Sequence, residues 1–328
     1  MDRNVAPKHD VPMWSETRWN GCWNAETGVG IYLHMGRFRK DLDIWWVQTV
    51  AYLPGSEIAV DRVWARVTED DGVRAGGFDL TLTEDGWTST YDGVLELTTT
   101  EQLTRAVRGS GAPSVPVRWE ISATPATPVW DLEDEGAKSG SNDFAGDAHL
   151  QQGMRTTGSL TVEGTEYSLD GIGWKDHSSG VRDFTHWGGH AFTLCVLDDM
   201  TLHAGAMHPA GGRPSMYFGK CYRNGDNGTA VTSFEAPTLT DLDVPGPLRC
   251  SVGLADGTTI GFTAEQVHAL PMTLTLDNDN INGLDWDGPR ASTCLIEGIS
   301  RLTFDDGRVG YAHLERSNAL AELKRPVL

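Results

Sequence analysis

Residues 173–184, GWKDHSSGVRDF, concentrate side chains that can transfer protons or bind polar groups. The segment holds two aspartates, a histidine, two serines, an arginine and a lysine. A carboxyl group or an imidazole here could donate a proton, with its neighbours tuning its pKa. The alternative is a polar corner, in which Asp and Ser side chains cap turn amides and Arg182 bridges strands. The segment alone leaves both interpretations open.

The candidate catalytic residues are Asp176, His177, Arg182 and Asp183. Asp176 and His177 are adjacent, so on an extended chain their side chains point to opposite faces. Gly180 can bend the chain between the two aspartates. Arg182 can hold either carboxylate in a bidentate pair. Strand-like runs precede and follow the segment, which predicts that it lies at a strand end or in a loop.

Metal, nucleotide and hydrolase motifs do not account for these residues. Four histidines fall within 23 residues of one another, but no H-x-H or H-E-x-x-H pattern joins them: His186, His190, His203 and His208. Counting Gly283 as sixth in an EF-hand loop puts Pro289 at the twelfth position, where a glutamate is needed. No Walker loop, helix-opening G-x-G or G-x-S-x-G elbow occurs. We expect no metal and no cofactor, and a hydrolase that uses Ser178 or Ser179 with His177 is the weakest alternative.

The composition restricts the partners of the protein. The chain has 46 acidic and 26 basic residues, a formal net charge of −20, which repels phosphate backbones and anionic lipid heads. Nucleic acid is therefore not expected, and a hydrophobic small molecule is favoured. No apolar run is long enough to insert into a membrane, and the first residues lack the apolar run of a signal peptide. Five scattered cysteines fit free thiols in a reducing, cytoplasmic compartment; the oligomeric state stays open, a homodimer included.

Turn signals between alternating runs predict an antiparallel, all-β protein. Six hairpins are expected, over residues 79–93, 159–171, 192–207, 216–234, 250–264 and 300–315. Asp-Gly and Asn-Gly suit their turns because the central residues must tolerate positive φ. Short helices are expected only at 100–108, 264–270 and 317–325.

A segment rich in Pro, Gly, Ser and acidic residues interrupts this pattern at 123–148. It divides the chain into a β domain at 1–130, a linker at 131–147 and a second β domain at 148–328, which would carry the Asp-His-Ser segment. Twelve tryptophans are many for this length, and most should pack in cores. Trp174 and Trp187 flank the polar segment and could line an apolar pocket or stabilise a cation.

Taken together, LDGIGWKDHSSGVRDF and the following THWGGHAF resemble the G-x-G-x-x-D-H-S-x-G-x-R-D motif of bacterial lipocalin-like two-domain proteins. These proteins are related to the AttH group and to the carotenoid 1,2-hydratases. The segments MWSETRW, AHLQQGMRTTGSL and DDGRVGYAHLERS agree in the expected order. The resemblance implies two consecutive lipocalin-like antiparallel β-barrels or half-barrels, with a pocket near their interface for a hydrophobic, often isoprenoid or polyketide, ligand.

By position, His177 matches the motif histidine implicated in hydratase chemistry, but Ser179 stands where such hydratases usually have a tryptophan. This substitution removes an aromatic face and argues against carotenoid hydration itself. The residues expected to bind the substrate are Trp174, Ser178, Ser179, Trp187, His190, His149 and Gln152.

Two functions are consistent with these features. The first is a cofactor-independent enzyme that hydrates, dehydrates, isomerises or cyclises a terpenoid-like or polycyclic molecule by proton transfer. Asp176 or Asp183 would supply the proton, with its pKa raised by burial. His177 would position water, and Arg182 would keep the second carboxylate charged. The second is a lipocalin-like binding protein or a Diels–Alderase-like pericyclase, which shapes its substrate without transferring a proton.

Overall fold

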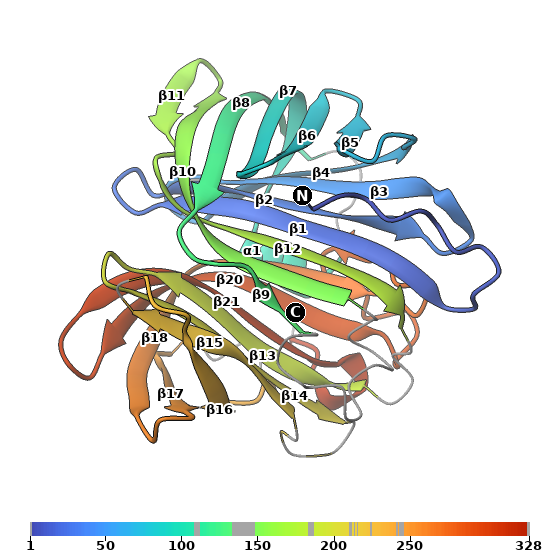
Figure 1. Ribbon diagram of the computed structural model, residues 1–328. Helices are drawn as coiled ribbons and strands as arrows, with labels where there is room; N and C mark the ends of the chain where they lie inside the picture. The colour runs from blue at the N-terminus through green and yellow to red at the C-terminus, as the bar shows by residue number, and fades with distance from the viewer. Residues whose placement is uncertain are drawn as a thin grey trace.

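The computed structural model describes residues 2–107, 112–132, 148–182, 187–209, 212, 214, 216–223, 225–240, 242 and 246–326. Within these residues almost all regular structure is antiparallel β, arranged as two barrels that pack against each other (Figure 1). All six predicted hairpins are present. Each of the two barrels is a ring of strands in which the last strand pairs with the first.

The first barrel is built from the N-terminal half of the described chain. Its ring runs β10 (Ala148–Val162), β12 (Gly171–Val181), β1 (Trp14–Asn24), β2 (Val29–Phe38), β3 (Asp41–Tyr52), β4 (Glu57–Arg66), β7 (Gly86–Thr99) and β8 (Ser114–Pro125), and β8 pairs back to β10. The shorter strands are β5 (Gly72–Ala75), β6 (Phe78–Thr83), β9 (Trp130–Asp131) and β11 (Thr165–Ser168). Closure leaves the ring without an edge strand, because every strand in it has a neighbour on each side.

The second barrel closes in the same way. Its ring runs β13 (Trp187–Val196), β14 (Met200–Pro209), β15 (Met216–Arg223), β16 (Thr229–Glu235), β17 (Leu248–Leu254), β18 (Thr259–Leu274), β20 (Thr293–Phe304) and β21 (Val309–Ala319), and β21 pairs with β13. The short strand β19 (Asn280–Asn282) pairs with β18. The expected architecture of two lipocalin-like barrels is confirmed.

The expected division of the chain at 131–147 does not match the sheets. Strands β10, β11 and β12 follow that segment in sequence, yet they complete the first sheet. The chain passes from the first barrel to the second between Val181 and Trp187. The change in composition lies between β9 and β10, within the part of the chain that builds the first sheet. It did not mark the boundary between the barrels, because the sheet to which a strand belongs depends on long-range pairing that local composition does not report.

Two of the three predicted α-helices do not form. Residues 264–270 lie inside β18, and 317–325 begin in β21 and continue into a short 3₁₀ helix, η1 (Leu320–Glu322). Pairing with β20 along both strands overrides the local helix preference. The first prediction is confirmed as α1 (Thr100–Arg105), which packs on β18.

Apolar side chains form separate cores inside each barrel and a third core between the barrels. The third core stacks Trp19 on Trp174, with ring centroids 5.4 Å apart, and includes Trp23, Tyr52 and Phe192. Aromatic pairs of this kind add about 0.5–1.5 kcal/mol each beyond area burial. Gly21 makes room for the stack, because a Cβ there would lie 2.6 Å from the ring of Trp174.

Strands β1 and β12 are buried on both faces, because one face points into the first barrel and the other towards the second barrel. Trp19 and Trp174 belong to the core between the barrels, whereas Cys22 belongs to the core inside the first barrel. Successive side chains of a strand alternate between faces. Each of these strands therefore contributes to two environments at once.

Candidate active site

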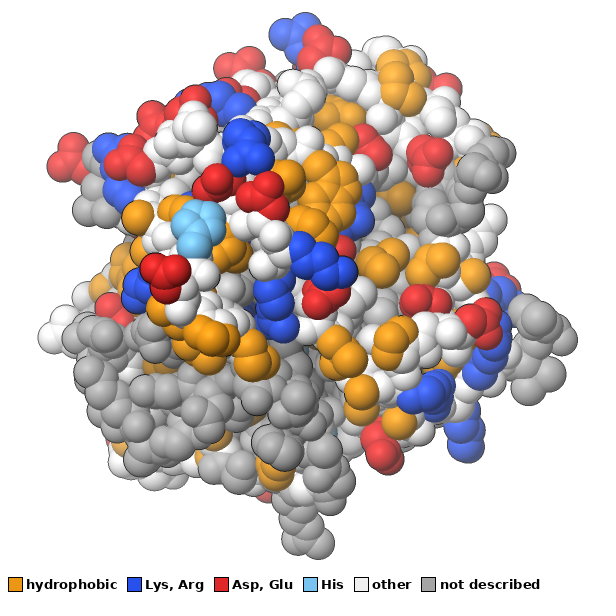
Figure 2. All heavy atoms as spheres, turned by 90° about the vertical axis from the view of Figure 1, so that its right-hand side faces the viewer, with side chains coloured by type: hydrophobic (Ala, Val, Ile, Leu, Met, Phe, Trp, Pro, Cys, Tyr) orange, Lys and Arg blue, Asp and Glu red, His pale blue; other side chains and the backbone are white. Residues whose placement is uncertain are grey.

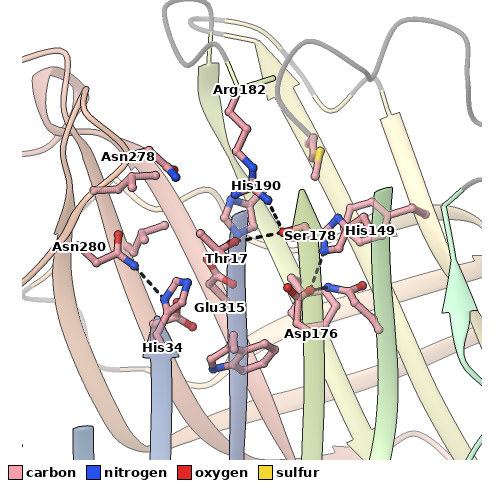
Figure 3. A pocket seen from close by; sticks show the side chains of 18 of the residues that line it. Thr17, His34, His149, Asp176, Ser178, Arg182, His190, Asn278, Asn280 and Glu315 are labelled. Atoms are coloured by element: carbon pink, nitrogen blue, oxygen red, sulfur yellow. Dashed lines mark hydrogen bonds and ion pairs between the residues drawn. The ribbon is translucent and has the colours of Figure 1, made fainter. Parts of the chain in front are cut away.

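A cavity of about 150 Å³ lies between the two barrels. Its walls come from β1, β2, β3, β10 and β12 of the first barrel and from β13, β14, β15, β18, β19, β20 and β21 of the second. Apolar side chains line much of it: Trp19, Trp46, Phe192, Met207, Phe218, Leu274 and Leu295. Polar side chains gather in three groups, most of which Figure 3 shows converging on one space.

The first group surrounds Asp176 on β12. His149 Nε2 lies 2.6 Å from Asp176 Oδ2, and Gln151 Nε2 donates to the same oxygen over 2.6 Å (Figure 3). His203 Nε2 lies 2.5 Å from Gln151 Oε1. Burial opposes ionisation, but His149, Gln151 and Arg182 outweigh it and hold the pKa of Asp176 below its usual range. Asp176 is therefore a charged acceptor, which corrects the expectation that burial raises its pKa.

The second group is formed by Thr17, Ser178 and Arg182. The Ser178 and Thr17 hydroxyl oxygens lie 3.1 Å apart, on paired positions of β12 and β1. Arg182 Nη2 donates to Ser178 Oγ, and its Nε is buried with no hydrogen-bond partner. Burial and the nearby Arg39 lower the pKa of Arg182 to about 10 although the charge of Asp176 opposes them, so Arg182 stays charged at neutral pH.

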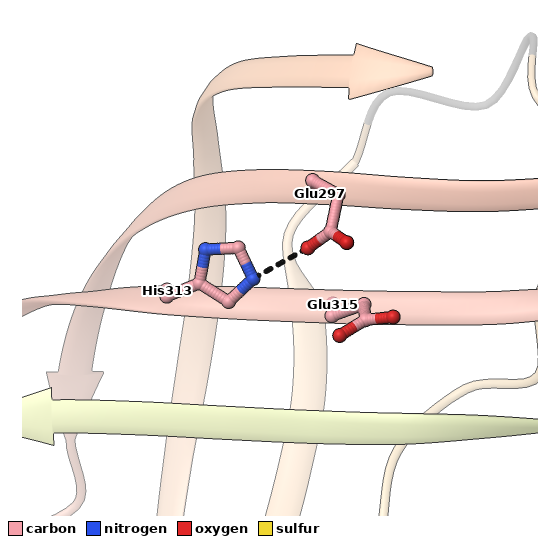
Figure 4. Close-up of side chains that lie close together, drawn as sticks. All are labelled: Glu297, His313 and Glu315. Atoms are coloured by element: carbon pink, nitrogen blue, oxygen red, sulfur yellow. Dashed lines mark hydrogen bonds and ion pairs between the residues drawn. The ribbon is translucent and has the colours of Figure 1, made fainter. Parts of the chain in front are cut away.

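The third group belongs to the second barrel and centres on two glutamates. His313 Nε2 lies 2.8 Å from Glu297 Oε2, and the Tyr32 hydroxyl donates to Glu297 Oε1 over 3.0 Å. Glu315 Oε1 lies 2.6 Å from His190 Nε2. The paired positions of Glu297 and Glu315 on β20 and β21 bring the two carboxyl groups together (Figure 4).

These two glutamates titrate in opposite directions. Burial and the charge of Glu315 raise the pKa of Glu297. Burial also opposes the ionisation of Glu315, but its hydrogen bond and ion pair with His190 prevail and lower its pKa. The same pair raises the pKa of His190. Glu297 thus holds its proton to higher pH than an ordinary glutamate, and the neighbouring Glu315 loses its proton at lower pH.

A fifth imidazole, His34, comes from β2 of the first barrel. His34 Nδ1 lies 3.0 Å from the Tyr32 hydroxyl and 2.8 Å from Asn280 Nδ2. Burial lowers the pKa of His34 to about 4, so the ring is neutral at physiological pH. A neutral imidazole can relay a proton or orient a polar substrate group.

Glu297, His313 and Glu315 are also the one set of potential metal ligands found within the described residues. Their ligand atoms all lie within 4.8 Å of one another (Figure 4). Two carboxylates and an imidazole could hold a divalent cation. However, His313 Nε2 is hydrogen-bonded to Glu297 and His190 Nε2 to Glu315, so these contacts already engage the atoms that would bind a cation.

His177 lies on the opposite face of β12, inside the first barrel and away from the cavity. Its Nδ1 is 2.6 Å from Asp2 Oδ1 and its Nε2 is 2.9 Å from Glu16 Oε1. Arg18 binds Asp2 through both terminal nitrogens, at 2.8 and 3.1 Å, and Arg37 binds Glu16 at 2.8 Å. We call Asp2, Glu16, Arg18, Arg37 and His177 the barrel clasp, because they hold the N-terminal segment in the barrel.

The other predicted residues divide between these environments. Ser178, His149, His190 and Arg182 line the cavity with Asp176. Trp174 packs beneath it, against Trp19. Ser179 and Gln152 directly follow the cavity residues Ser178 and Gln151 on their strands, so their side chains point away from the cavity. Gln152 donates instead to the Thr127 carbonyl over 2.7 Å. Asp183 and the side chain of Trp187 lie outside the described residues.

Several cavity residues escaped prediction: Thr17, Trp19, His34, Trp46, Gln151, Asn278, Asn280, Glu297 and Glu315. Glu315 lies within AHLERS, one of the segments that carried the family resemblance, and Gln151 is one position from the predicted Gln152. Alternation from His149 would have selected Gln151 instead. Glu297 has no motif around it, and only its pairing with Glu315 across β20 and β21 reveals it.

The chain belongs to the family described as "Domain of unknown function (DUF7064)", which matches residues 2–319. No curated protein matches the sequence. The fold is similar to a crystal structure provisionally assigned as an AttH from Nitrosomonas europaea, with a TM-score of 0.58 and 13% identity over 94% of this chain and 93% of that one.

The fold is also similar to the crystal structure of CghA, with a TM-score of 0.54 and 11% identity over 97% and 90% of the two chains. Kievitone hydratase from Nectria haematococca gives 0.47 and 12% over 93% and 88%. The AttH-like, lipocalin-like fold implied by the sequence is thereby confirmed. In the part of the chain that the structure describes, no helix is long and apolar enough to cross a membrane.

Proposed function

We propose that this protein is an enzyme that moves protons to and from a hydrophobic small molecule bound between its two barrels. The reaction is a hydration, dehydration, isomerisation or cyclisation. One observation supports it above the others: Glu297 and Glu315 line the same apolar cavity with pKa values displaced in opposite directions. Such a split assigns one carboxyl group as the acid and the other as the base.

In this proposal Glu297 donates its proton to a carbon or oxygen atom of the substrate. The cation that develops lies near the ionised Glu315 and the faces of Trp19 and Trp46, which stabilise positive charge. Loss of a proton to Glu315, directly or from an attacking water, completes the reaction. Asp176, held ionised by His149 and Gln151, orients polar groups on the opposite wall.

This assignment predicts deuterium transfer in D₂O. The purified protein is incubated in D₂O with the apolar extract of its source cells, and mass spectrometry follows compounds that gain one deuterium or the elements of water. We expect such products from the wild type and a loss of at least about 100-fold in Glu297→Gln, because general acids contribute about 10²–10⁴-fold. Glu101→Gln, on the exposed face of α1, is the matched control and should retain full activity.

The pH profile gives a second test. Activity should fall on the alkaline side as Glu297 loses its proton, above the range of an ordinary glutamate, and on the acid side as Glu315 gains one. Glu297→Gln that keeps wild-type turnover would refute the assignment.

A binding protein or pericyclase that transfers no proton is the second candidate. It is favoured by the hydrogen bonds that already engage Asp176, Glu297 and Glu315 within the protein. In that case the pH profile is flat, and rates follow cavity volume in variants such as Phe192→Ala and Leu295→Ala.

A cytoplasmic location stays a prediction from the sequence.

A further inference from the structure

Arg182 is a guanidinium group at the cavity wall; its charge interacts with Asp176, but no carboxylate of the described residues accepts a hydrogen bond from it. It lines the cavity, and its one side-chain hydrogen bond within the described residues goes to Ser178. Its Nε is buried and unpartnered. A buried hydrogen-bond donor without an acceptor costs free energy, which points to an acceptor supplied by a ligand.

The surroundings of Arg182 favour an oxygen anion. The Ser178 and Thr17 hydroxyls lie beside the guanidinium on the same wall, and Figure 3 shows all three directed towards one another. Arg39 donates to the Arg182 carbonyl over 3.1 Å, which adds a second guanidinium at this end. Asp176 contacts His149 and accepts from Gln151, and it acts on Arg182 through its charge with no hydrogen bond between the two in the described residues. Guanidinium and hydroxyl donors together match a planar carboxylate.

The net charge of the whole protein opposes such binding. A chain of formal net charge −20 repels anions in general. On the face shown in Figure 2, acidic and basic side chains alternate with apolar ones, so that face offers no extended basic surface. Any preference for an anion must therefore come from a local site within the cavity.

We propose that Arg182, Ser178 and Thr17 form an oxyanion subsite, and that the substrate is a hydrophobic molecule bearing a carboxylate. The anionic end binds at this subsite. The apolar body lies along Trp19, Trp46 and Phe192, towards Glu297 and Glu315. This inference rests on the proposed function only for where the substrate reacts, near Glu297 and Glu315. Anion binding at the subsite does not depend on catalysis.

The test compares octanoate, octanol and octylamine by isothermal titration calorimetry at neutral pH. We expect octanoate to bind the wild type at least about tenfold more tightly than octanol, and octylamine most weakly. Arg182→Met should remove the preference, and Arg182→Lys should keep part of it, because charge remains while the planar fork is lost. Arg249→Met, an exposed arginine paired with Asp305, is the matched control.

Glu297→Gln separates this inference from the proposed function. It should abolish deuterium transfer while leaving the preference for octanoate unchanged. Equal affinity of the wild type for octanoate and octanol would overturn the subsite, and so would a preference that survives Arg182→Met. The wild-type comparison decides the matter even if Arg182→Met does not fold. If the wild type prefers octanoate to octanol but transfers no deuterium, the subsite is supported and the proposed proton-transfer function is refuted.

Discussion

The two faces of β12 carry similar polar side chains, but one face borders a cavity and the other lies in a closed interior. On one face, Asp176 and Ser178 border a cavity and bind side chains that can exchange partners with a ligand. On the other face, His177 lies between Asp2 and Glu16 in a closed set of ion pairs. Composition is therefore a poor guide to role here. The difference lies in whether a polar group meets open space or a complete set of partners.

This difference separates stability from function. A paired charge in a closed interior cannot be removed alone without leaving its partner uncompensated. A polar group at a cavity wall can lose its charge at little structural cost, because water or a ligand can take the place of the lost partner. Substitutions on the two faces should therefore have different consequences, although they are one residue apart.

The largest effect is expected in the barrel clasp. Glu16→Gln removes the charge that pairs with Arg37 and His177, in a side chain with 0% exposure. We expect the free energy of unfolding to fall by about 3 kcal/mol, as for other broken buried pairs, measured by denaturant titration. Asp305→Asn, from the exposed pair with Arg249, should leave the unfolding midpoint unchanged. If both variants behave alike, the clasp adds no more than a surface pair.

A smaller effect should divide the adjacent residues of the motif. His177→Gln is expected to lower stability by about 2 kcal/mol, because hydrogen bonds to charged groups are lost, and to leave octanoate affinity unchanged. Asp176→Asn should cost about 1 kcal/mol or less, because the amide oxygen still accepts from Gln151. It should strengthen octanoate binding several-fold by removing an anion near Arg182. Thermal unfolding and calorimetry on both variants check this, and a reversed pattern would place His177 at the cavity.

The smallest effect concerns acid stability. Burial opposes ionisation of Asp2 and Glu16, but His177 and the arginines prevail and lower both pKa values in the folded state. Their contribution is complete above the unfolded values near about 4 and is lost as pH falls through the folded ones. Only the start of this loss of stabilisation falls within the pH range of the measurement. Asp2→Asn should therefore modestly reduce the fall in melting temperature between about pH 5 and 2. Parallel curves for the two proteins would argue against this role of Asp2.

Local chemistry made part of this structure predictable from the sequence. Asp-Gly and Glu-Gly turns located the hairpins, since few residues tolerate positive φ, and Glu163 and Gly164 both adopt it. The opposite orientation of Asp176 and His177 follows from strand geometry. Which of the two faces the cavity does not follow, because β12 is buried on both sides and its apolar pattern gives no direction.

The proposed acid–base pair, Glu297 and Glu315, could not be predicted from local sequence patterns. Glu297 and Glu315 are separated from Asp176 by more than a hundred residues, and they meet it only because two closed barrels pack together. The helix predicted at 264–270 failed for a related reason, since pairing of β18 with β20 decided its conformation. Long-range pairing determined both outcomes.

The closed rings have a consequence for how the cavity can work. Thr17, Asp176, Ser178, Glu297 and Glu315 all lie within strands that are paired on both sides, not in loops. Their backbone amides should be among the slowest in the molecule to exchange with solvent. The dipoles and charges of the cavity are then fixed before any ligand arrives, so little reorganisation accompanies a change of charge in the substrate. New substrates can be accommodated by exchanging alternate side chains along these strands, with the backbone left in place.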